Sequence, residues 1–219
     1  MLSADQPNLA VKFLTAEDVG AALNVSRETL ARLKKFVDLL LKWQRSINLI
    51  GPGTVDDVWA RHVLDCGQLV RHLPDNPGSV LDIGSGAGLP GIILALLGVP
   101  NVRMIESDAK KCVFLREAAR ISEMSVEVVE ARAEQVACGP ADIVTARAVA
   151  PLTRLLELTE PYIKTNTICL FFKGVNYKTE LKELENNWNM QMETHQSLTQ
   201  SGSIILQMAS VTRVHVPND

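Results

Sequence analysis

The sequence predicts a doubly wound, Rossmann-like α/β fold, a mostly parallel sheet with helices on both faces, preceded by a helical extension. From residue 80 onward, short apolar runs alternate with longer helical stretches, which is typical of strand–helix–strand units. A glycine-rich turn follows the first run directly. Before the turn-rich segment 73–79, apolar residues recur at helical spacing instead. We therefore expect a helical extension over residues 1–75 and a core domain over residues 76–219.

The extension is predicted to contain amphipathic helices. Ser26 is expected to be an N-cap, and the apolar residues after it recur at steps of three and four as far as about Ile47. Thr54 is expected to cap a further helix, with Asp56 and Asp57 in its first turn, where carboxylates complement the helix dipole. The apolar stripe of the first helix needs a packing partner.

Residues 15–33 also match the pattern of a DNA-binding helix-turn-helix, in which Arg27 and Thr29 would face a major groove. We favour an ordinary helical hairpin, because the second helix continues far beyond the length of a recognition helix. A helix-turn-helix regulator that senses a nucleotide remains the alternative from another functional class.

The core domain is predicted to alternate strands with helices. Strands are expected at 80–83, 102–105, 126–129, 142–146 and 167–172, and helices at 91–97, 110–122 and 152–163. The last apolar runs, 190–192 and 204–208, are expected to add an antiparallel edge.

Composition excludes several classes. Of 219 residues, 47% are hydrophobic and the net charge is −3, so the chain has enough apolar material for a core and is not disordered. The longest apolar run, 89–100, is too short and too broken for a membrane span, and the first residues lack signal-peptide features. The cysteines are far apart and the histidines have no paired ligand spacing. We therefore expect a cytoplasmic protein with reduced thiols, no membrane and no metal.

The segment 79–92 carries the strongest signal for a ligand. Gly84, Gly86 and Gly88 follow a buried strand at every second position, which lets backbone approach a ligand and exposes N–H groups. The spacing from Gly86 formally fits a nicotinamide or flavin dinucleotide as well. We favour S-adenosylmethionine (SAM), because the pattern that begins at Gly84 is typical of SAM enzymes. Glu106, at the carboxyl edge of the second strand, can accept hydrogen bonds from ribose hydroxyls with either cofactor, and Asp82 is expected to orient the loop.

Several motifs in order resemble one family. These are LLLKWQRSINLIG (39–51), RHVLDC (61–66), LDIGSGAGLPGIILA (81–95), IESDAKKCVFLRE (105–117), ARAE (131–134), DIVTARAVAPL (142–152) and FFKG (171–174). Together they resemble the bacterial ribosomal RNA small subunit methyltransferase G family, also called glucose-inhibited division protein B. The resemblance implies SAM-dependent methylation of guanine N7 in 16S rRNA within the small ribosomal subunit.

The resemblance also implies roles for individual residues. Cofactor-binding residues would be Gly84, Ser85, Gly86, Gly88 and Leu89 in the loop, Glu106 at the ribose, Ala133 and Glu134 beside the adenine, and Arg147. Arg147 would in addition serve the methyl-transfer pocket as the catalytic residue, and Lys173 would meet RNA phosphate. Arg61 and His62 have two interpretations, a helix face that holds RNA or SAM over the pocket, or a hydrogen bond between the extension and the core.

Two motifs that the sequence lacks limit which atom of a base it is expected to methylate. An exocyclic amine methyltransferase usually has an Asn/Asp-Pro-Pro-aromatic loop after the fourth strand, and this place reads ARAVAPL. Cytosine C5 methylation needs a thiolate nucleophile, but the cysteines here lack the Pro-Cys setting. Guanine N7 needs no general base. We expect a monomer that binds 16S rRNA without an obligate protein partner, with a SAM methyltransferase of another substrate and a nicotinamide oxidoreductase as the remaining alternatives.

Overall fold

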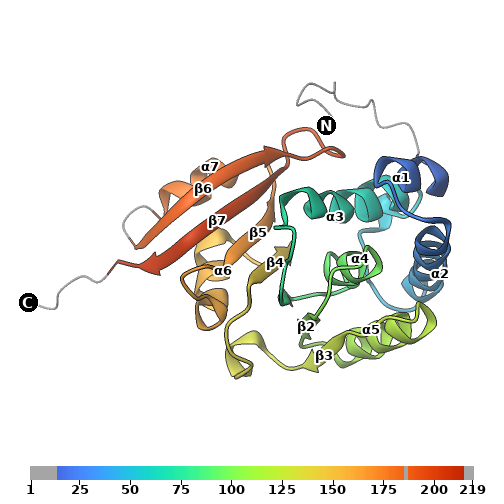
Figure 1. Cartoon of the computed structure of the whole chain (residues 1–219), viewed down its shortest axis with the longest axis horizontal. Helices are drawn as coiled ribbons and strands as arrows, with labels where there is room; N and C mark the ends of the chain where they lie inside the picture. Colours follow the sequence, from blue (N-terminus) through green and yellow to red (C-terminus); the bar gives the residue numbers. More distant parts are fainter. Residues whose placement is uncertain (1–13, 185–186, 215–219) are drawn as a thin grey trace, which may run out of the picture.

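The computed structural model describes residues 14–184 and 187–214. A mixed seven-stranded sheet forms the centre of the molecule, in the order β3-β2-β1-β4-β5-β7-β6 (Figure 1). The strands are β1 (Val80–Ile83), β2 (Val102–Glu106), β3 (Glu127–Glu130), β4 (Ile143–Arg147), β5 (Ile168–Lys173), β6 (Trp188–Gln196) and β7 (Ile204–Arg213). The predicted Rossmann-like α/β class is confirmed, and so is the antiparallel edge.

The strand order creates a switch point between β1 and β4. Strands β1 to β5 are parallel, and the chain runs from β1 through β2 to β3 before it returns to β4 on the other side of β1. In open parallel sheets, ligands bind outside the carboxyl ends of the strands at such a point. The predicted glycine loop follows β1 at this place. β7 then pairs antiparallel with β5, and β6 with β7.

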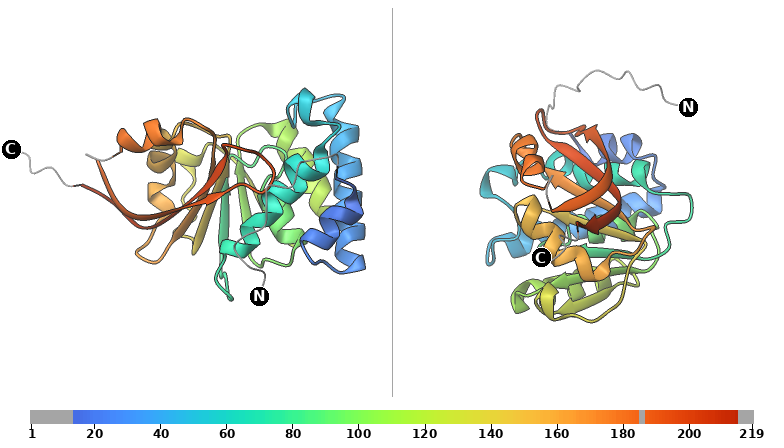
Figure 2. Two further views of the ribbon diagram at one scale, coloured as in Figure 1. Left: turned by 90° about the horizontal axis from the view of Figure 1, so that it is seen from above. Right: turned by 90° about the vertical axis from the view of Figure 1, so that its left-hand side faces the viewer.

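Helices cover both faces of the sheet. One face packs against α4 (Gly91–Leu96) and α5 (Ala109–Ile121). The helices α1 (Ala16–Ala22), α2 (Arg27–Gln44) and α3 (Asp65–Gly67) belong to the same apolar cluster, with α2 and α3 packed on these helices and α1 on α2. The other face packs against α6 (Leu152–Thr159) and α7 (Tyr177–Lys182). Figure 2 shows these layers from two further directions. No helix within residues 14–184 and 187–214 is long and apolar enough to cross a membrane.

The helical extension shares its core with the sheet domain. The buried stripe of α2 includes Leu33, Phe36 and Leu40, and it belongs to the same apolar cluster as the residues of α4 and α5. The rings of Phe36 and Phe114 lie 6.3 Å apart, and Trp43 packs edge-on against Phe114 at 5.7 Å. The packing partner that the stripe needs is therefore the core domain. The division at residue 75 stays a prediction.

Helix α2 is part of a packed hairpin. It is 18 residues long, and Ser26 caps it by accepting a hydrogen bond from Thr29 N, as predicted. The helix ends at Gln44, three residues earlier than expected. Because its apolar face is buried against the core, the ordinary hairpin describes it better than a recognition helix does.

The expected cap at Thr54 is wrong. The next helical segment begins at Trp59, as the π-helix η2 (Trp59–Leu64), and its start has no side-chain cap. Thr54 closes the short 3₁₀ turn η1 (Pro52–Thr54) instead and donates its hydroxyl to the carbonyl of Gly51 at 2.7 Å. The predicted helix 152–163 is also shorter, because a 3₁₀ turn, η5 (Glu160–Tyr162), follows Thr159.

We expect Phe114→Ala to lower the free energy of unfolding by about 3–5 kcal/mol, since it removes a fully buried ring. Denaturant unfolding followed by fluorescence and circular dichroism should give a single transition, because extension and core share that ring's cluster. Val113→Ala is the matched control, because Val113 is 52% exposed on the same helix. Two separate transitions, with only one affected, would show that the extension and the core unfold independently.

Candidate cofactor and methyl-transfer site

The glycine loop is hydrogen-bonded to β2 at the point where it leaves β1. The backbone N–H groups of Gly84 and Ser85 both donate to the carbonyl of Ile105, at 2.9 and 3.1 Å. The loop then turns back on itself, because Gly88 N donates to the carbonyl of Ser85 at 2.7 Å. The loop is thus fixed at both ends before the chain enters α4.

Gly88 and Gly86 are glycines for different physical reasons. Gly88 has a φ of +76°, and a Cβ there would lie 2.2 Å from Ile92 Cγ1, so this glycine makes room for packing. Gly86 has a φ of +55°, and its nearest heavy atom to a built Cβ is Gly84 O at 3.8 Å. The space above Gly86 is therefore open. Any side chain at this position would project into it and also strain the backbone.

Asp82 orients the loop, as predicted. The residue is fully buried, and its Oδ2 accepts a hydrogen bond from Gly91 N at 3.1 Å. Its Oδ1 accepts from Thr145 Oγ1 at 2.9 Å, which links β1 to β4. Burial raises the pKa of Asp82 to about 6, because the charged form is poorly solvated there. Asp82 has no contact with open space and acts on the loop.

Glu106 lies at the carboxyl end of β2, beside the loop. It is 7% exposed. Its Oε2 accepts a hydrogen bond from Gly86 N at 2.8 Å, and its Oε1 accepts from Asp108 N at 2.8 Å. A carboxylate has about four lone-pair positions, so each oxygen can accept one further bond. Glu106 thus holds the loop and keeps acceptor capacity for ligand hydroxyls.

Two hollows meet at Gly84 and Glu106. One has a volume of about 310 Å³ and is lined by Ile83, Ile105, Ser107, residues 131–134, Val149, Ala150, Arg154 and Leu158. The other has a volume of about 270 Å³ and is lined by residues 49–51, His62, residues 85–87, Leu89, Lys111, Arg147 and Ala148. Both contain Gly84 and Glu106, and they form one cleft at the carboxyl ends of β1, β2 and β4.

This cleft fits SAM. Glu106 supplies free acceptor positions where the two hollows meet, and the open space above Gly86 lets a ligand touch the backbone. The first hollow combines aliphatic walls, from Ile83, Ile105 and Val149, with polar groups at its rim. A nucleoside needs this combination of flat apolar walls and a few directed polar groups.

The structure gathers most of the predicted cofactor residues in this cleft. Gly84, Ser85, Gly86, Leu89, Glu106, Ala133, Glu134 and Arg147 all line it. Gly88 does not line it and packs against Ile92. Glu134 pairs with Arg154, and the carbonyl of Ala133 accepts a hydrogen bond from the hydroxyl of Tyr162. The carbonyl of Val136 also accepts from Tyr162, at 3.0 Å, so this ring fixes the wall next to the first hollow.

Arg147 is held by the segment that joins η2 to α3. Its Nη2 donates to the carbonyl of Arg61 at 2.8 Å, its Nη1 to Cys66 Sγ at 3.4 Å, and its Nε lies 3.4 Å from Asp65 Oδ2. The guanidinium also lies 5.7 Å from the centre of the Phe172 ring. Arg147 is thus a fixed positive charge at the wall of the second hollow.

His62 lines the same hollow and is neutral. Thr54 donates its hydroxyl proton to Gly51, so it accepts at 2.7 Å from His62 Nε2–H. Nδ1 is then unprotonated, and it is buried without a partner among the described residues. Burial, together with the positive charges of Arg147 and Arg61, lowers the pKa of His62 to about 3. The hydrogen bond of His62 thus stays within the extension, and the bond between extension and core is made by the carbonyl of Arg61 instead, which accepts from Arg147. Contact of His62 with RNA or SAM stays a prediction.

Two further predicted residues, Arg61 and Lys173, do not line the cleft. Arg61 touches the site through its carbonyl, which accepts from Arg147. Lys173 is 9% exposed, and its ammonium lies 2.5 Å from Glu180 Oε2 and 3.3 Å from the carbonyl of Ala150. In this conformation Lys173 holds the loop after β4, and its contact with RNA phosphate stays a prediction.

The sequence patterns missed two residues of the site, Gln44 and Asp65. Gln44 donates to the carbonyl of Ile50 at 2.8 Å and accepts from the N–H groups of Leu49 and Ile50 at 2.9 Å, so its amide shapes the wall of the second hollow. Asp65 is buried beside Arg147. No spacing or periodicity in the sequence marks the partners of these two side chains.

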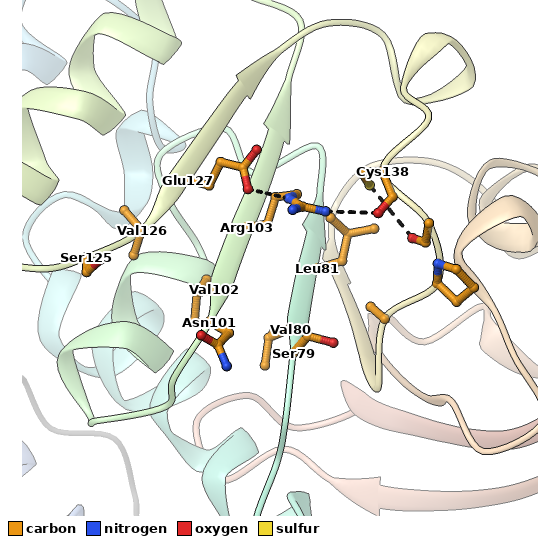
Figure 3. Close-up of a pocket in the computed structure, with 13 residues that line it drawn as sticks. Ser79, Val80, Leu81, Asn101, Val102, Arg103, Ser125, Val126, Glu127 and Cys138 are labelled. Atoms are coloured by element: carbon orange, nitrogen blue, oxygen red, sulfur yellow. Dashed lines mark hydrogen bonds and ion pairs between the residues drawn. The ribbon is translucent and has the colours of Figure 1, made fainter.

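Another hollow, of about 350 Å³, lies at the amino ends of the strands, on the opposite edge of the sheet (Figure 3). Its two charged residues pair with each other, because Arg103 donates to Glu127 at 2.6 Å, and Arg103 also donates to the carbonyl of Cys138 at 3.2 Å. This hollow is separate from the cleft. Within the described residues, no group of three or more acidic, histidine or cysteine side chains is arranged to hold a metal.

Sequence comparison gives one consistent family. The family described as rRNA small subunit methyltransferase G (GidB) matches residues 29–207. A ribosomal RNA small subunit methyltransferase G from Paramagnetospirillum magneticum is 47% identical over 197 residues, covering 90% of this chain and 96% of the relative. Its counterpart from Rhodospirillum rubrum is 43% identical and covers 91% of this chain and 100% of the relative.

Solved structures share the fold. M. jannaschii TYW2 in complex with AdoMet has a TM-score of 0.57 at 17% identity, covering 78% of this chain and 80% of that chain. The ribosomal protein L11 methylase from Lactobacillus delbrueckii subsp. bulgaricus has a TM-score of 0.55 at 17% identity, covering 71% and 79%. At such identity the likeness concerns the architecture alone.

We expect Gly86→Ala to weaken SAM binding by roughly tenfold or more, because the methyl group enters the open space of the cleft and the left-handed backbone is strained. Isothermal calorimetry measures the affinity. Gly98→Ala is the matched control, since Gly98 also has a positive φ, of +90°, and no atom within 4 Å of a built Cβ. Equal SAM affinity in both variants would show that the loop does not contact the cofactor.

We expect His62 to make the protein sensitive to acid. Its pKa is about 3 in the folded state and near 6.5 in the unfolded chain, so the unfolded chain binds the extra proton and stability falls as pH drops below about 6.5. The slope should approach about 1.4 kcal/mol per pH unit. Denaturant unfolding between pH 4 and 6.5 should show a smaller loss for His62→Gln, whereas between pH 7.5 and 9 the two proteins should run parallel. Identical slopes in the acid range would contradict the buried neutral imidazole.

Proposed function

Because the chain belongs to the rRNA small subunit methyltransferase G family, we propose that it methylates N7 of a guanine in 16S rRNA of the small ribosomal subunit. The chain is a SAM-dependent methyltransferase, and rRNA is its substrate class. One observation carries the finer proposal. The cleft joins a nucleoside-sized hollow, at Glu106, to a second hollow that ends on a fixed arginine and a neutral histidine.

The proposed reaction makes small chemical demands on the protein. SAM supplies the methyl group, and guanine N7 has a lone pair and no proton, so no general base has to remove one. Rate enhancement then comes from alignment, which can contribute roughly 7–11 kcal/mol. A site for this reaction needs rigid walls and fixed polar groups. Hydrogen bonds to backbone groups hold Glu106 and Arg147 in place in the cleft.

We assign the roles as follows. Glu106 accepts hydrogen bonds from the ribose hydroxyls, and the backbone of residues 84–89 faces the rest of the cofactor. The residues Ala133 and Glu134 flank the adenine. Arg147 lies at the methyl-transfer pocket as the catalytic residue, where its positive charge favours the electron-rich N7 and O6 edge of guanine. The neutral His62 binds the substrate beside it, together with Arg61 and Lys173.

We propose that the protein acts on 16S rRNA as a monomer, without an obligate protein partner. The proposed substrate is a ribosomal subunit, so we place the enzyme in the cytoplasm. Phosphate contacts to RNA should make its affinity fall with salt.

The decisive assay incubates the protein with labelled SAM and either 30S subunits or 16S rRNA from a strain that lacks this enzyme. We expect label to enter 16S rRNA as 7-methylguanine, identified after nucleoside digestion. Subunits from a strain that has the enzyme serve as control and should accept little label. Label in another nucleoside would select a different substrate, and no label in any rRNA fraction despite measured SAM binding would defeat the proposal.

A further inference from the structure

Asp65 is buried between Arg147 and the C-terminal hairpin. It begins α3 directly after η2, and 8% of it is exposed. Its Oδ2 lies 3.4 Å from Arg147 Nε. Its Oδ1 accepts hydrogen bonds from Thr199 Oγ1 at 2.7 Å, from Gln68 Nε2 at 2.9 Å and from Ser197 Oγ at 3.0 Å. The two oxygens therefore face different elements.

The two hydroxyl donors come from residues 197–199, the first part of the loop between β6 and β7. We call residues 197–199 the hairpin tip. Ser197 and Thr199 are themselves buried, and Leu198 N donates to Gln68 Oε1 at 2.9 Å, so the whole tip is attached to the α3 segment. Figures 1 and 2 show this tip beside α3. Residues more than 130 positions apart in sequence thus share one buried carboxylate.

Asp65 is the counter-charge of Arg147. In the part of the chain that the structure describes, it is the one carboxylate paired with this arginine. Cys66, whose Sγ accepts from Arg147 Nη1, is a neutral thiol, because burial raises its pKa to about 12. A buried carboxylate is costly unless its partners satisfy it. The hydroxyls of the hairpin tip satisfy Oδ1 and so fix the rotation of the group whose other oxygen faces the guanidinium.

We infer that the tip of the β6–β7 hairpin positions Arg147 through Asp65 for methyl transfer. The inference rests on the proposed role of Arg147. Ser197 and Thr199 do not line the cleft, so they act on the arginine and not on the cofactor. Without their hydroxyls the carboxylate can rotate, and the guanidinium loses its fixed partner. The consequence falls on the rate of methyl transfer at saturating SAM and RNA, and SAM affinity stays unchanged.

The test compares Ser197→Ala/Thr199→Val with the wild type in single-turnover methyl transfer. We expect the rate at saturation to fall roughly ten- to a hundredfold, since a displacement of about 1 Å near a reacting centre can cost roughly a hundredfold. Calorimetric SAM affinity should remain within about twofold, which also shows that the variant is folded. Ser197→Thr/Thr199→Ser keeps both hydroxyls and should restore most of the rate. Thr199→Val alone gives the same comparison if the double variant does not fold.

The matched control removes two buried hydroxyls elsewhere. Ser122→Ala/Thr159→Val changes the same residue types, and neither side chain contacts Asp65. This control should keep the wild-type rate. If it slows the reaction as much as the hairpin variant, the effect is one of general stability and the inference is overturned.

A double-mutant cycle separates the inference from the proposed function. Arg147→Ala should itself lower the rate, and the hairpin substitutions should then cause little further loss, because their effect passes through Arg147. An unchanged rate in Arg147→Ala would refute the role of the arginine. If Arg147→Ala is slow, the positioning role alone would be overturned by hairpin substitutions that lower the rate as much in Arg147→Ala as in the wild type, or that leave the wild-type rate unchanged.

Discussion

The carboxylate of Glu106 is the contact on which the cofactor side of the cleft depends. Its two oxygens join Gly86 N at the turn of the loop to Asp108 N at the start of α5. Because Gly86 has a left-handed backbone and open space above it, the loop needs such an anchor to keep its shape. The same oxygens retain lone pairs toward the cleft. One side chain thus sets the loop geometry and supplies the acceptors for a ribose.

The opposite wall of the cleft depends on a second fixed charge. Arg147 ends β4, but its position is set by the segment from η2 to α3, through the carbonyl of Arg61 and the side chains of Asp65 and Cys66. The helical extension is therefore part of the site, and it shares its apolar core with α4 and α5. This arrangement supplies fixed groups for a reaction that needs mainly alignment.

The sheet and the glycine loop could be predicted because their signals are local. Alternating apolar runs mark β1 to β5, and the spacing from Gly84 to Gly88 marks the loop. The contacts of Thr54, Gln44 and Asp65 could not be predicted, because a polar side chain without periodicity does not reveal its distant partner. Thr54 is a residue type that often caps helices, but its hydroxyl binds Gly51 and His62. Asp65 pairs with Arg147 and with a hairpin 132 residues away, a contact that only the folded chain creates.

A crystal structure of the protein with S-adenosylhomocysteine tests the account most directly. We expect the nucleoside to occupy the hollow between Glu106 and residues 131–134, with both ribose hydroxyls on the Glu106 carboxylate and the Gly86 N–H still bound to it. The homocysteine part should extend over the glycine loop toward Arg147. A cleft that stays empty at saturating ligand, or a ligand that leaves Glu106 untouched, would contradict the account.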